Sequence, residues 1–296
     1  MCTSPIAMYK RGKVYKRTPP PFALSDCPDI FVPCGKCDEC RERKRQDWTR
    51  RIVVENFLHD ASSFITLTYD DNHLPNPPKC SRKHIQKFLK RFRNVFRDYG
   101  ILVKDFKYFI VSEYGEKFGR PHYHGVLFGV DFHQPCWRSR LASIKDRHPI
   151  YTSEILEEIW SQGFVSFDVV TPSSVAYVTK YVTKNTADNF KLFSRGLGKA
   201  FFFNGEELSP RGVQAYDNGF IVLPVGRFGF VKSPIPKNID RYCKLYDPMK
   251  WAEVSHIRQD FVQRKRVDTR STAERVAIQK IHDKAEKQKR KLDNEI

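Results

Sequence analysis

Two histidines that flank one tyrosine are the residues of this sequence whose types and spacing most directly suggest chemistry. His122 and His124 lie in the stretch GRPHYHGVLFG, whose apolar continuation predicts a β-strand. Residues two apart on a strand share a face, so both imidazoles point the same way and Tyr123 points to the opposite face. Such a pair is a common metal-binding arrangement, and two structural histidines are the alternative.

A carboxylate is expected beside this pair. The preceding stretch FKYFIVSEYG also predicts a strand, and a short turn near Lys117 and Phe118 would join the two strands into a hairpin. In that register Glu113 lies directly across from His122 on the same face, whereas a slip of one residue would turn it away. Two imidazoles and one carboxylate suit Mg²⁺ or Mn²⁺ as well as Zn²⁺ or Fe²⁺, so the sequence does not identify the metal.

Paired tyrosines lie on a predicted helix over residues 173–185, which Thr171 and Pro172 would begin. One face of this helix carries two tyrosines and two lysines in a repeated pattern: Tyr177, Lys180, Tyr181 and Lys184. An ordinary amphipathic helix, with tyrosines at the rim and lysines in solvent, would show the same pattern. Alternatively, a tyrosine could attack a phosphate whose charge the lysines bind, which is nucleophilic catalysis.

The elements that must position these residues follow the order β-α-β-β-α-β-α. Alternation and helical periodicity predict strands over 62–69, 106–115, 121–130 and 163–170, and helices beginning near residues 82, 152 and 173. This order predicts an α+β fold in which helices flank an antiparallel β-sheet. We expect four regions: a basic, cysteine-containing region over 1–60, a catalytic domain over 61–190, a loop and hairpin extension over 191–248, and a basic helical tail over 249–296.

The charge of the chain indicates a polyanionic partner. Lys and Arg number 52 and Asp and Glu number 34, which gives a formal net charge of +18. An excess of this size favours nucleic acid over the ordinary needs of solubility. The N-terminus has no apolar signal region, and no apolar run is long enough to span a bilayer. We therefore expect a soluble protein that is not exported and has no membrane partner.

A cysteine cluster and a basic helix characterise the first sixty residues. Cys34, Cys37 and Cys40 are spaced C-x-x-C-x-x-C, and with Cys27 or Cys80 as a fourth ligand they could hold structural zinc. Reduced thiols at the start of a helix are the alternative. The helix that follows would contact DNA phosphates or present a solvated basic face. Its basic residues are Arg41, Arg43, Lys44, Arg45, Arg50 and Arg51.

Three motifs in this order resemble those of the HUH endonucleases of rolling-circle replication. The likeness is to the replication initiators of microviruses, the gokushovirus-like single-stranded DNA phages. The matching motifs are FITLTY (64–69), RPHYHGVLFG (120–129) and YVTKYVTK (177–184). The stretches PCGKCDECRERKRQDWTRR and SRGLG are also similar to this phage group, so the resemblance covers residues 33–198.

The resemblance implies an RRM-like core and a nicking mechanism. His122, His124 and Glu113 would bind Mg²⁺ or Mn²⁺ beside the scissile phosphate of single-stranded or supercoiled phage origin DNA. One tyrosine would attack, leaving a 5′-phosphotyrosine and a free 3′-hydroxyl, and the second would later help to rejoin the strand. The sequence has no G-x-x-x-x-G-K-[ST] loop. Unwinding and synthesis would then come from a host helicase and polymerase in the bacterial cytoplasm.

Other classes of protein share parts of this pattern. A relaxase or single-tyrosine transposase of the same superfamily would use the same histidines. A non-catalytic single-stranded DNA-binding protein needs only a sheet and a basic surface. A non-haem iron oxygenase also uses two histidines and a carboxylate, but it has no use for paired tyrosines or for the charge of +18.

Overall fold

The computed structural model describes residues 2–11, 14–17, 28–98, 106–115, 119–145, 148–182, 189–225 and 229–264. The chain divides into two compact units. The smaller comprises Met1–Lys44 with Asp260–Ile296, and the larger comprises Arg45–Gln259. The division of the sequence into four regions stays a prediction.

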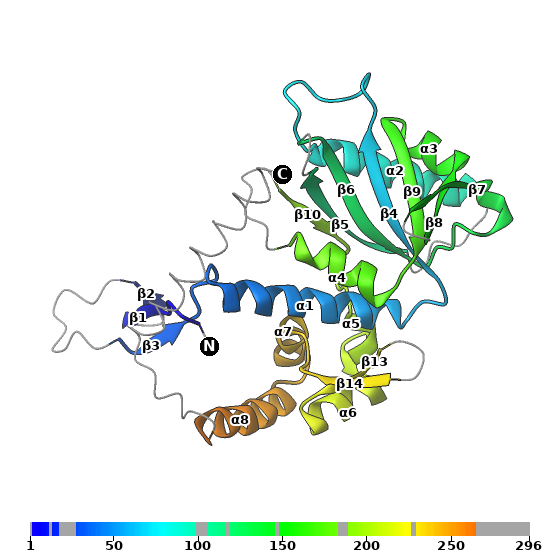
Figure 1. Cartoon of the computed structure of the whole chain (residues 1–296). Coiled ribbons are helices and arrows are strands. Elements are labelled where there is room, and N and C mark those ends of the chain that lie inside the picture. Colours follow the sequence, from blue (N-terminus) through cyan, green and yellow to red (C-terminus); the bar gives the residue numbers. More distant parts are fainter. Residues whose placement is uncertain are drawn as a thin grey trace. The chain divides into compact units, whose positions relative to one another are not determined.

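A seven-stranded antiparallel sheet forms the centre of the larger unit, which confirms the predicted α+β fold class (Figure 1). The order across the sheet is β10-β5-β6-β4-β9-β8-β7. The strands are β4 (Ser62–Tyr69), β5 (Lys107–Tyr114), β6 (Pro121–Phe128), β7 (Ser139–Lys145), β8 (His148–Ser153), β9 (Gly163–Val169) and β10 (Lys191–Phe193).

Helices cover both faces of this sheet, and each face has its own apolar cluster. Alternate residues such as Ile65 and Tyr123 pack on one face with α2 (Arg82–Asp98) and α3 (Glu154–Trp160). Their neighbours, such as Val126, pack on the opposite face with α1 (Asp38–Asn56) and α4 (Pro172–Lys180). The two-residue period of a strand therefore sorts side chains between two cores, and His122 and His124 share the face of α4.

The hairpin of β7 and β8 is an addition that the sequence analysis did not predict. Its residues mix charges, small side chains and a proline, and Leu141 and Ile144 are exposed, so the alternation that marks a half-buried strand is missing. A register shift between Leu141 and Ser143 breaks the pattern further. A short 3₁₀ helix, η1 (Pro135–Trp137), precedes the hairpin.

A third apolar cluster forms where loops and a hairpin were expected. The predicted hairpin is present, as β13 (Ile221–Val225) paired with β14 (Gly229–Ser233). Short helices replace much of the predicted loop. The other elements here are α5 (Lys199–Phe202), β11 (Phe203–Asn204), β12 (Glu207–Leu208), α6 (Pro210–Asn218), α7 (Lys237–Tyr246) and α8 (Pro248–Arg264). The predicted tail is described only as far as the end of α8.

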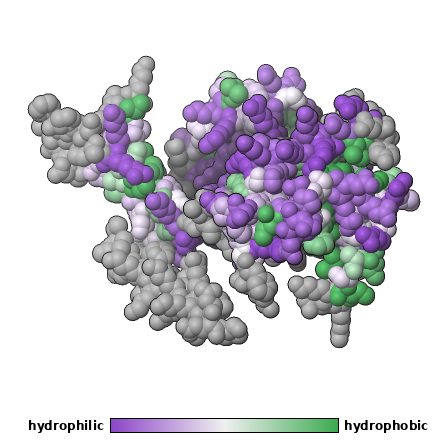
Figure 2. All heavy atoms as spheres, turned by 90° about the horizontal axis from the view of Figure 1, so that it is seen from above, coloured by the Kyte–Doolittle hydropathy of each residue, from purple (hydrophilic) through white to green (hydrophobic). Residues whose placement is uncertain are grey.

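The smaller unit contains a three-stranded sheet of order β2-β1-β3. Its strands are β1 (Ile6–Arg11), β2 (Val14–Lys16) and β3 (Ile30–Val32), and the described apolar side chains of β2 and β3 are largely exposed. Among the described helices of the chain, none is long and apolar enough to cross a membrane. Hydrophilic residues cover most of the described surface that Figure 2 shows.

Candidate active site

The predicted hairpin register brings one carboxylate to the histidine pair. In the pairing of β5 with β6, Glu113 is the direct partner of His122. In the pairing of β6 with β4 on its other side, His124 is the partner of Thr66. The three candidate ligands Glu113, His122 and His124 therefore share the sheet face that α4 covers, and their ligand atoms all lie within 4.8 Å of one another.

The two imidazoles present the same ring nitrogen to the carboxylate. Oε2 of Glu113 lies 3.1 Å from Nε2 of His124 and 3.5 Å from Nε2 of His122. The other nitrogen of each ring is occupied: His122 Nδ1 donates to the carbonyl of Arg120 at 3.0 Å, and His124 Nδ1 lies 3.0 Å from Oγ1 of Thr66. Such outer partners fix the orientation of metal-binding histidines.

This donor set fits a divalent cation. When Nδ1 of His122 donates its proton to a carbonyl, the neutral ring presents a lone pair at Nε2, and that lone pair faces a carboxylate oxygen. Two electron-rich groups face each other favourably only when a proton or a cation lies between them. One carboxylate and two neutral imidazoles leave coordination positions for water or substrate.

Glu113 is held in its ionised form. Burial opposes ionisation of this carboxyl, whose residue is 3% exposed, but hydrogen bonds from His122, His124 and Tyr181 outweigh that effect. The pKa of Glu113 therefore lies well below its usual range. The carboxylate keeps its negative charge at neutral pH, as a metal ligand requires.

The structure places both tyrosines of α4 against His124, in unlike surroundings. Tyr177 is 41% exposed, and its hydroxyl lies 3.4 Å from Nε2 of His124. Tyr181 is 5% exposed and stacks on the same imidazole, with ring centres 5.7 Å apart. Burial, Tyr177 and Glu113 all raise the pKa of Tyr181. The two tyrosine rings are 5.0 Å apart, so both phenols belong to one site.

The start of α4 is fixed by a capping box. Thr171 accepts a hydrogen bond from the backbone of Ser174, whose side chain bonds back to Thr171. α4 is described as far as Lys180, with Tyr181 at its C-cap, so the described helix is shorter than predicted. Lys180 is exposed on the helix, and Lys184 lies outside the described residues.

The predicted basic residues of α1 differ in their environments. Arg43 and Lys44 are exposed, whereas Arg41 pairs with Asp38 and Arg45 is half-buried. Arg50 donates to Ser233 at 2.8 Å. Arg51 is 8% exposed, and its guanidinium lies 3.8 Å from the centre of the Trp48 ring. The packing of Arg51 supports a structural role, and only the exposed members suit contact with a phosphate backbone.

The cysteine cluster is completed by a residue that the sequence analysis did not consider. Cys2 joins Cys34, Cys37 and Cys40, and the four Sγ atoms lie within 4.8 Å of one another, close enough to hold a metal ion. Cys27, the predicted fourth ligand, lies outside the described residues. Cys80, the alternative, belongs to the larger unit, where its thiol lies 3.5 Å from the carbonyl of Glu113. No local spacing signal marks Cys2, because 32 residues separate it from Cys34.

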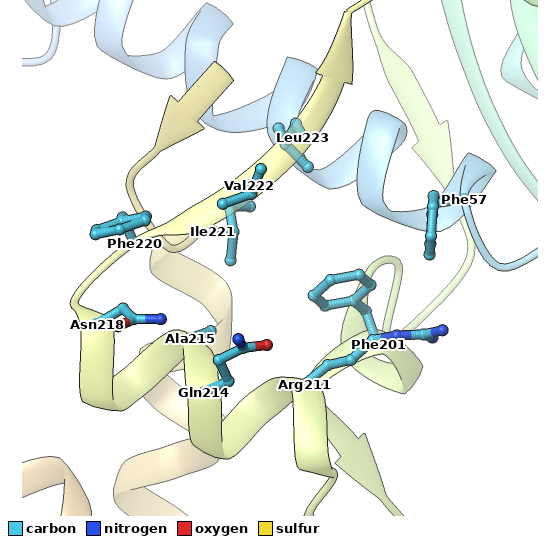
Figure 3. A pocket seen from close by; sticks show the side chains of 10 residues that line it. All are labelled: Phe57, Phe201, Arg211, Gln214, Ala215, Asn218, Phe220, Ile221, Val222 and Leu223. Carbon is cyan, nitrogen blue, oxygen red and sulfur yellow. The ribbon is translucent and has the colours of Figure 1, made fainter. Parts of the chain in front are cut away.

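A pocket of about 260 Å³ lies elsewhere in the larger unit (Figure 3). Phe57 and Phe201 line it, with the guanidinium of Arg211 5.2 Å and 5.6 Å from their ring centres. The pocket shares no lining residue with the cluster of Glu113 and the two histidines. It therefore adds nothing to the chemistry of that cluster.

Comparison with known proteins identifies relatives among phages. Residues 62–186 match the family of the replication-associated protein ORF2. The chain is 29% identical over 229 residues to "Replication-associated protein VP4" of Bdellovibrio phage phiMH2K, covering 75% of this chain and 70% of that protein. It is 27% identical over 252 residues to "Replication-associated protein ORF2" of Spiroplasma virus 4, covering 79% and 72%.

A third relative, "Replication-associated protein ORF4" of Chlamydia phage 1, is 32% identical over 191 residues. This match covers 58% of the present chain and 46% of the Chlamydia phage protein. No solved structure matches the chain significantly.

Proposed function

Residues 62–186 of this chain belong to the replication-associated protein ORF2 family of small single-stranded DNA phages, and from this premise we propose that the protein nicks phage origin DNA to begin rolling-circle replication. The substrate is single-stranded or supercoiled DNA, and the reaction is a phosphodiester transesterification through tyrosine. The observation that supports it best is the position of the Tyr177 hydroxyl, 3.4 Å from Nε2 of His124 beside the carboxylate of Glu113.

The metal site has three assigned residues in this proposal. His122, His124 and Glu113 hold a divalent cation, Mg²⁺ or Mn²⁺, which when bound polarises the scissile phosphate. Thr66 and the carbonyl of Arg120 hold the two rings in the orientation that directs Nε2 to this site. A charged Glu113 balances part of the cation's charge.

Covalent catalysis is assigned to α4. The phenol oxygen of Tyr177 forms a bond to phosphorus as the bond to the 3′ oxygen breaks. The phenol loses one proton and the leaving 3′ oxygen gains one, so the step is neutral in protons and leaves a 5′-phosphotyrosine. Lys180, with Lys184 from the matching motif, would bind the phosphate charge. The free 3′-hydroxyl is a primer that a host polymerase, aided by a host helicase, would extend.

Tyr181 serves the later step in this proposal. After one circuit of synthesis its phenol cuts the regenerated origin, and the released 3′-hydroxyl attacks the first phosphotyrosine to close a circle. Each bond to a tyrosine conserves the energy of a phosphodiester, so rejoining needs no ATP. The distance of 5.0 Å between the two rings allows both tyrosines to act beside one metal.

The test is a cleavage assay with a labelled single-stranded oligonucleotide that contains the phage origin. With Mn²⁺ or Mg²⁺, we expect a slowly migrating band on a denaturing gel in which the protein stays attached to the 5′ end. EDTA and the double change Tyr177→Phe, Tyr181→Phe should both abolish the band. Tyr151→Phe, in a tyrosine on β8 outside the site, is the matched control and should leave it unchanged.

The contrary result would favour the second candidate function. A protein that binds the origin oligonucleotide but forms no covalent adduct with either metal would be a non-catalytic single-stranded DNA-binding protein. A covalent adduct that Tyr181→Phe leaves fully able to recircularise DNA would instead indicate the single-tyrosine chemistry of a relaxase or transposase.

A further inference from the structure

Four cysteine sulfurs meet in the smaller unit, at one end of its three-stranded sheet. Cys2 precedes β1, Cys34 follows β3, and Cys37 and Cys40 lie at the start of α1. Three of these cysteines are buried and Cys34 is half-buried. The segments that carry them are far apart in sequence, so the convergence is a product of the fold.

The distances between the sulfurs match a tetrahedral metal site. Cys37 Sγ lies 3.7 Å from Cys2 Sγ, and Cys34 Sγ lies 4.0 Å from Cys40 Sγ. Four thiolates bound to zinc at about 2.3 Å are about 3.8 Å apart along the edges of a tetrahedron. A disulfide would bring two sulfurs to about 2.05 Å. The cluster therefore has the dimensions of a four-thiolate centre and not those of two bridged pairs.

The backbone around the cluster donates hydrogen bonds to the sulfurs. The amides of Lys36 and Cys37 both point to Cys34 Sγ, at 3.4 Å and 3.3 Å, and the amide of Cys34 points to Cys2 Sγ at 3.3 Å. The tight turn between Cys34 and Cys37 depends on Gly35, whose φ of +77° an L side chain rarely adopts. Amide donors around sulfur stabilise the thiolate form that binds metal.

The smaller unit has little else to hold it together. Among its described residues, the only buried apolar cluster consists of the cysteines themselves. Val14, Tyr15, Ile30 and Phe31, on the strands of the sheet, are all exposed. A small unit without an apolar core usually depends on a metal or disulfides for its stability.

We propose that Cys2, Cys34, Cys37 and Cys40 bind one structural zinc ion. All four positions of the tetrahedron are filled by protein thiolates, so the site has no open position for substrate and serves folding. Binding releases thiol protons to solvent and joins the N-terminal residues to the first turn of α1. The exposed Arg43 and Lys44 lie immediately after this turn, so the zinc would also order the start of the basic helix.

The first experiment measures metal in the full-length protein purified without chelators. We expect one tightly bound zinc per chain, and X-ray absorption at the zinc edge should show four sulfur neighbours at about 2.3 Å. Replacement by Co²⁺ should give the strong thiolate-to-cobalt absorption of a tetrahedral site. A zinc environment of nitrogen and oxygen, or no tightly bound zinc at all, would overturn the proposal.

Variants then identify the ligands. Cys2→Ser and Cys37→Ser should each lose the stoichiometric zinc and the cobalt spectrum, while Cys80→Ser and Cys136→Ser, in thiols outside the cluster, should keep both. The double variant His122→Ala, His124→Ala should also keep them, which separates this site from the proposed active site. If Cys27→Ser lost the metal and Cys2→Ser kept four sulfur neighbours, the assignment of Cys2 would be wrong.

Discussion

At the scale of single residues, Tyr177 and Tyr181 differ more than the repeated Tyr-x-x-Lys pattern suggests. Both rings contact His124, but Tyr177 is exposed to solvent and Tyr181 is buried against Glu113. Ionisation of Tyr181 would place a second negative charge beside that carboxylate, and its pKa is raised accordingly. An incoming strand therefore meets Tyr177 first, and Tyr181 becomes available only after the site has rearranged.

This difference predicts an order of use for the two tyrosines. Tyr177→Phe should reduce the first cleavage of an origin oligonucleotide by at least about 10³-fold, because it removes the accessible nucleophile. Tyr181→Phe should leave first cleavage within about threefold of wild type and lose rejoining, as measured by circular product on a gel. Equal loss of first cleavage in both variants would contradict the order.

Thr66 should tune the metal site without touching the metal. Its hydroxyl lies 3.0 Å from Nδ1 of His124, and loss of such an outer partner usually weakens metal binding or activity by about 10–100-fold. We predict that Thr66→Val weakens Mn²⁺ affinity by that amount in a titration followed by Mn²⁺ electron paramagnetic resonance. Thr68→Val, two residues along the same face of β4, should bind Mn²⁺ as wild type does. Equal affinities of the two variants would show that Thr66 does not position the ring.

At the scale of elements, Glu55 joins α1 to the sheet through a buried ion pair. The carboxylate is fully buried and lies 2.7 Å from Nζ of Lys107 on β5 and 2.9 Å from Nε2 of His59. It also accepts the amide of Gly198 at 2.6 Å. Burial alone would raise its pKa, but these three partners outweigh it and the pKa of Glu55 is lowered. α1 is thus held against the sheet by charge as well as by apolar packing.

This contact predicts a specific pH dependence of stability. A carboxyl whose folded pKa is lowered stabilises the fold at pH values above the unfolded pKa of about 4.3 and loses that contribution as pH falls through the folded pKa. Glu55→Gln should cost about 3 kcal/mol at pH 7, because it leaves Lys107 without its buried partner. In denaturant titrations the difference from wild type should shrink as the pH is lowered below about 4.3.

A surface carboxylate provides the control for this prediction. Glu253, on α8, lies 3.2 Å from Nζ of Lys250 and is well exposed. Because such surface pairs contribute about 0–1 kcal/mol, Glu253→Gln should change stability little at any pH. A Glu55→Gln difference that stayed constant from pH 7 to pH 3 would rule out a role for the charge of Glu55.

At the scale of the whole molecule, the net charge of +18 dominates association with DNA. Cations that neutralise phosphates release condensed counterions, so affinity for single strands falls with salt by about 0.7 logarithmic units per tenfold salt for each contact. The exposed Arg43 and Lys44 follow the cysteine cluster on α1 and are the residues of that helix best placed to make such contacts.

The salt dependence tests these two residues directly. Arg43→Ala with Lys44→Ala should weaken binding to unrelated single-stranded DNA and reduce the salt slope by about 1.4, twice the value for one contact. Fluorescence anisotropy at several salt concentrations measures both quantities. Lys87→Ala with Lys90→Ala removes the same charge from the exposed side of α2 and should alter the slope less. Identical slopes for the two double variants would show that only total charge matters.

The sequence by itself determined the parts of this protein that depend on local periodicity and on neighbouring strands. The alternation of β4 and β6, the order of helices and strands, and the short hairpin connection were enough to place Glu113 across from His122. A two-residue period and a short turn leave few registers, so this part of the site could be predicted without coordinates.

Only the tertiary structure decided the contacts that join distant segments. Which tyrosine of α4 is exposed depends on how the helix lies on the sheet, and helical spacing alone treats Tyr177 and Tyr181 alike. Cys2 joins Cys34 because the strands between them return the chain to its start. Such contacts depend on packing over long loops, where closure costs little more for one distant partner than for another and spacing therefore carries no signal.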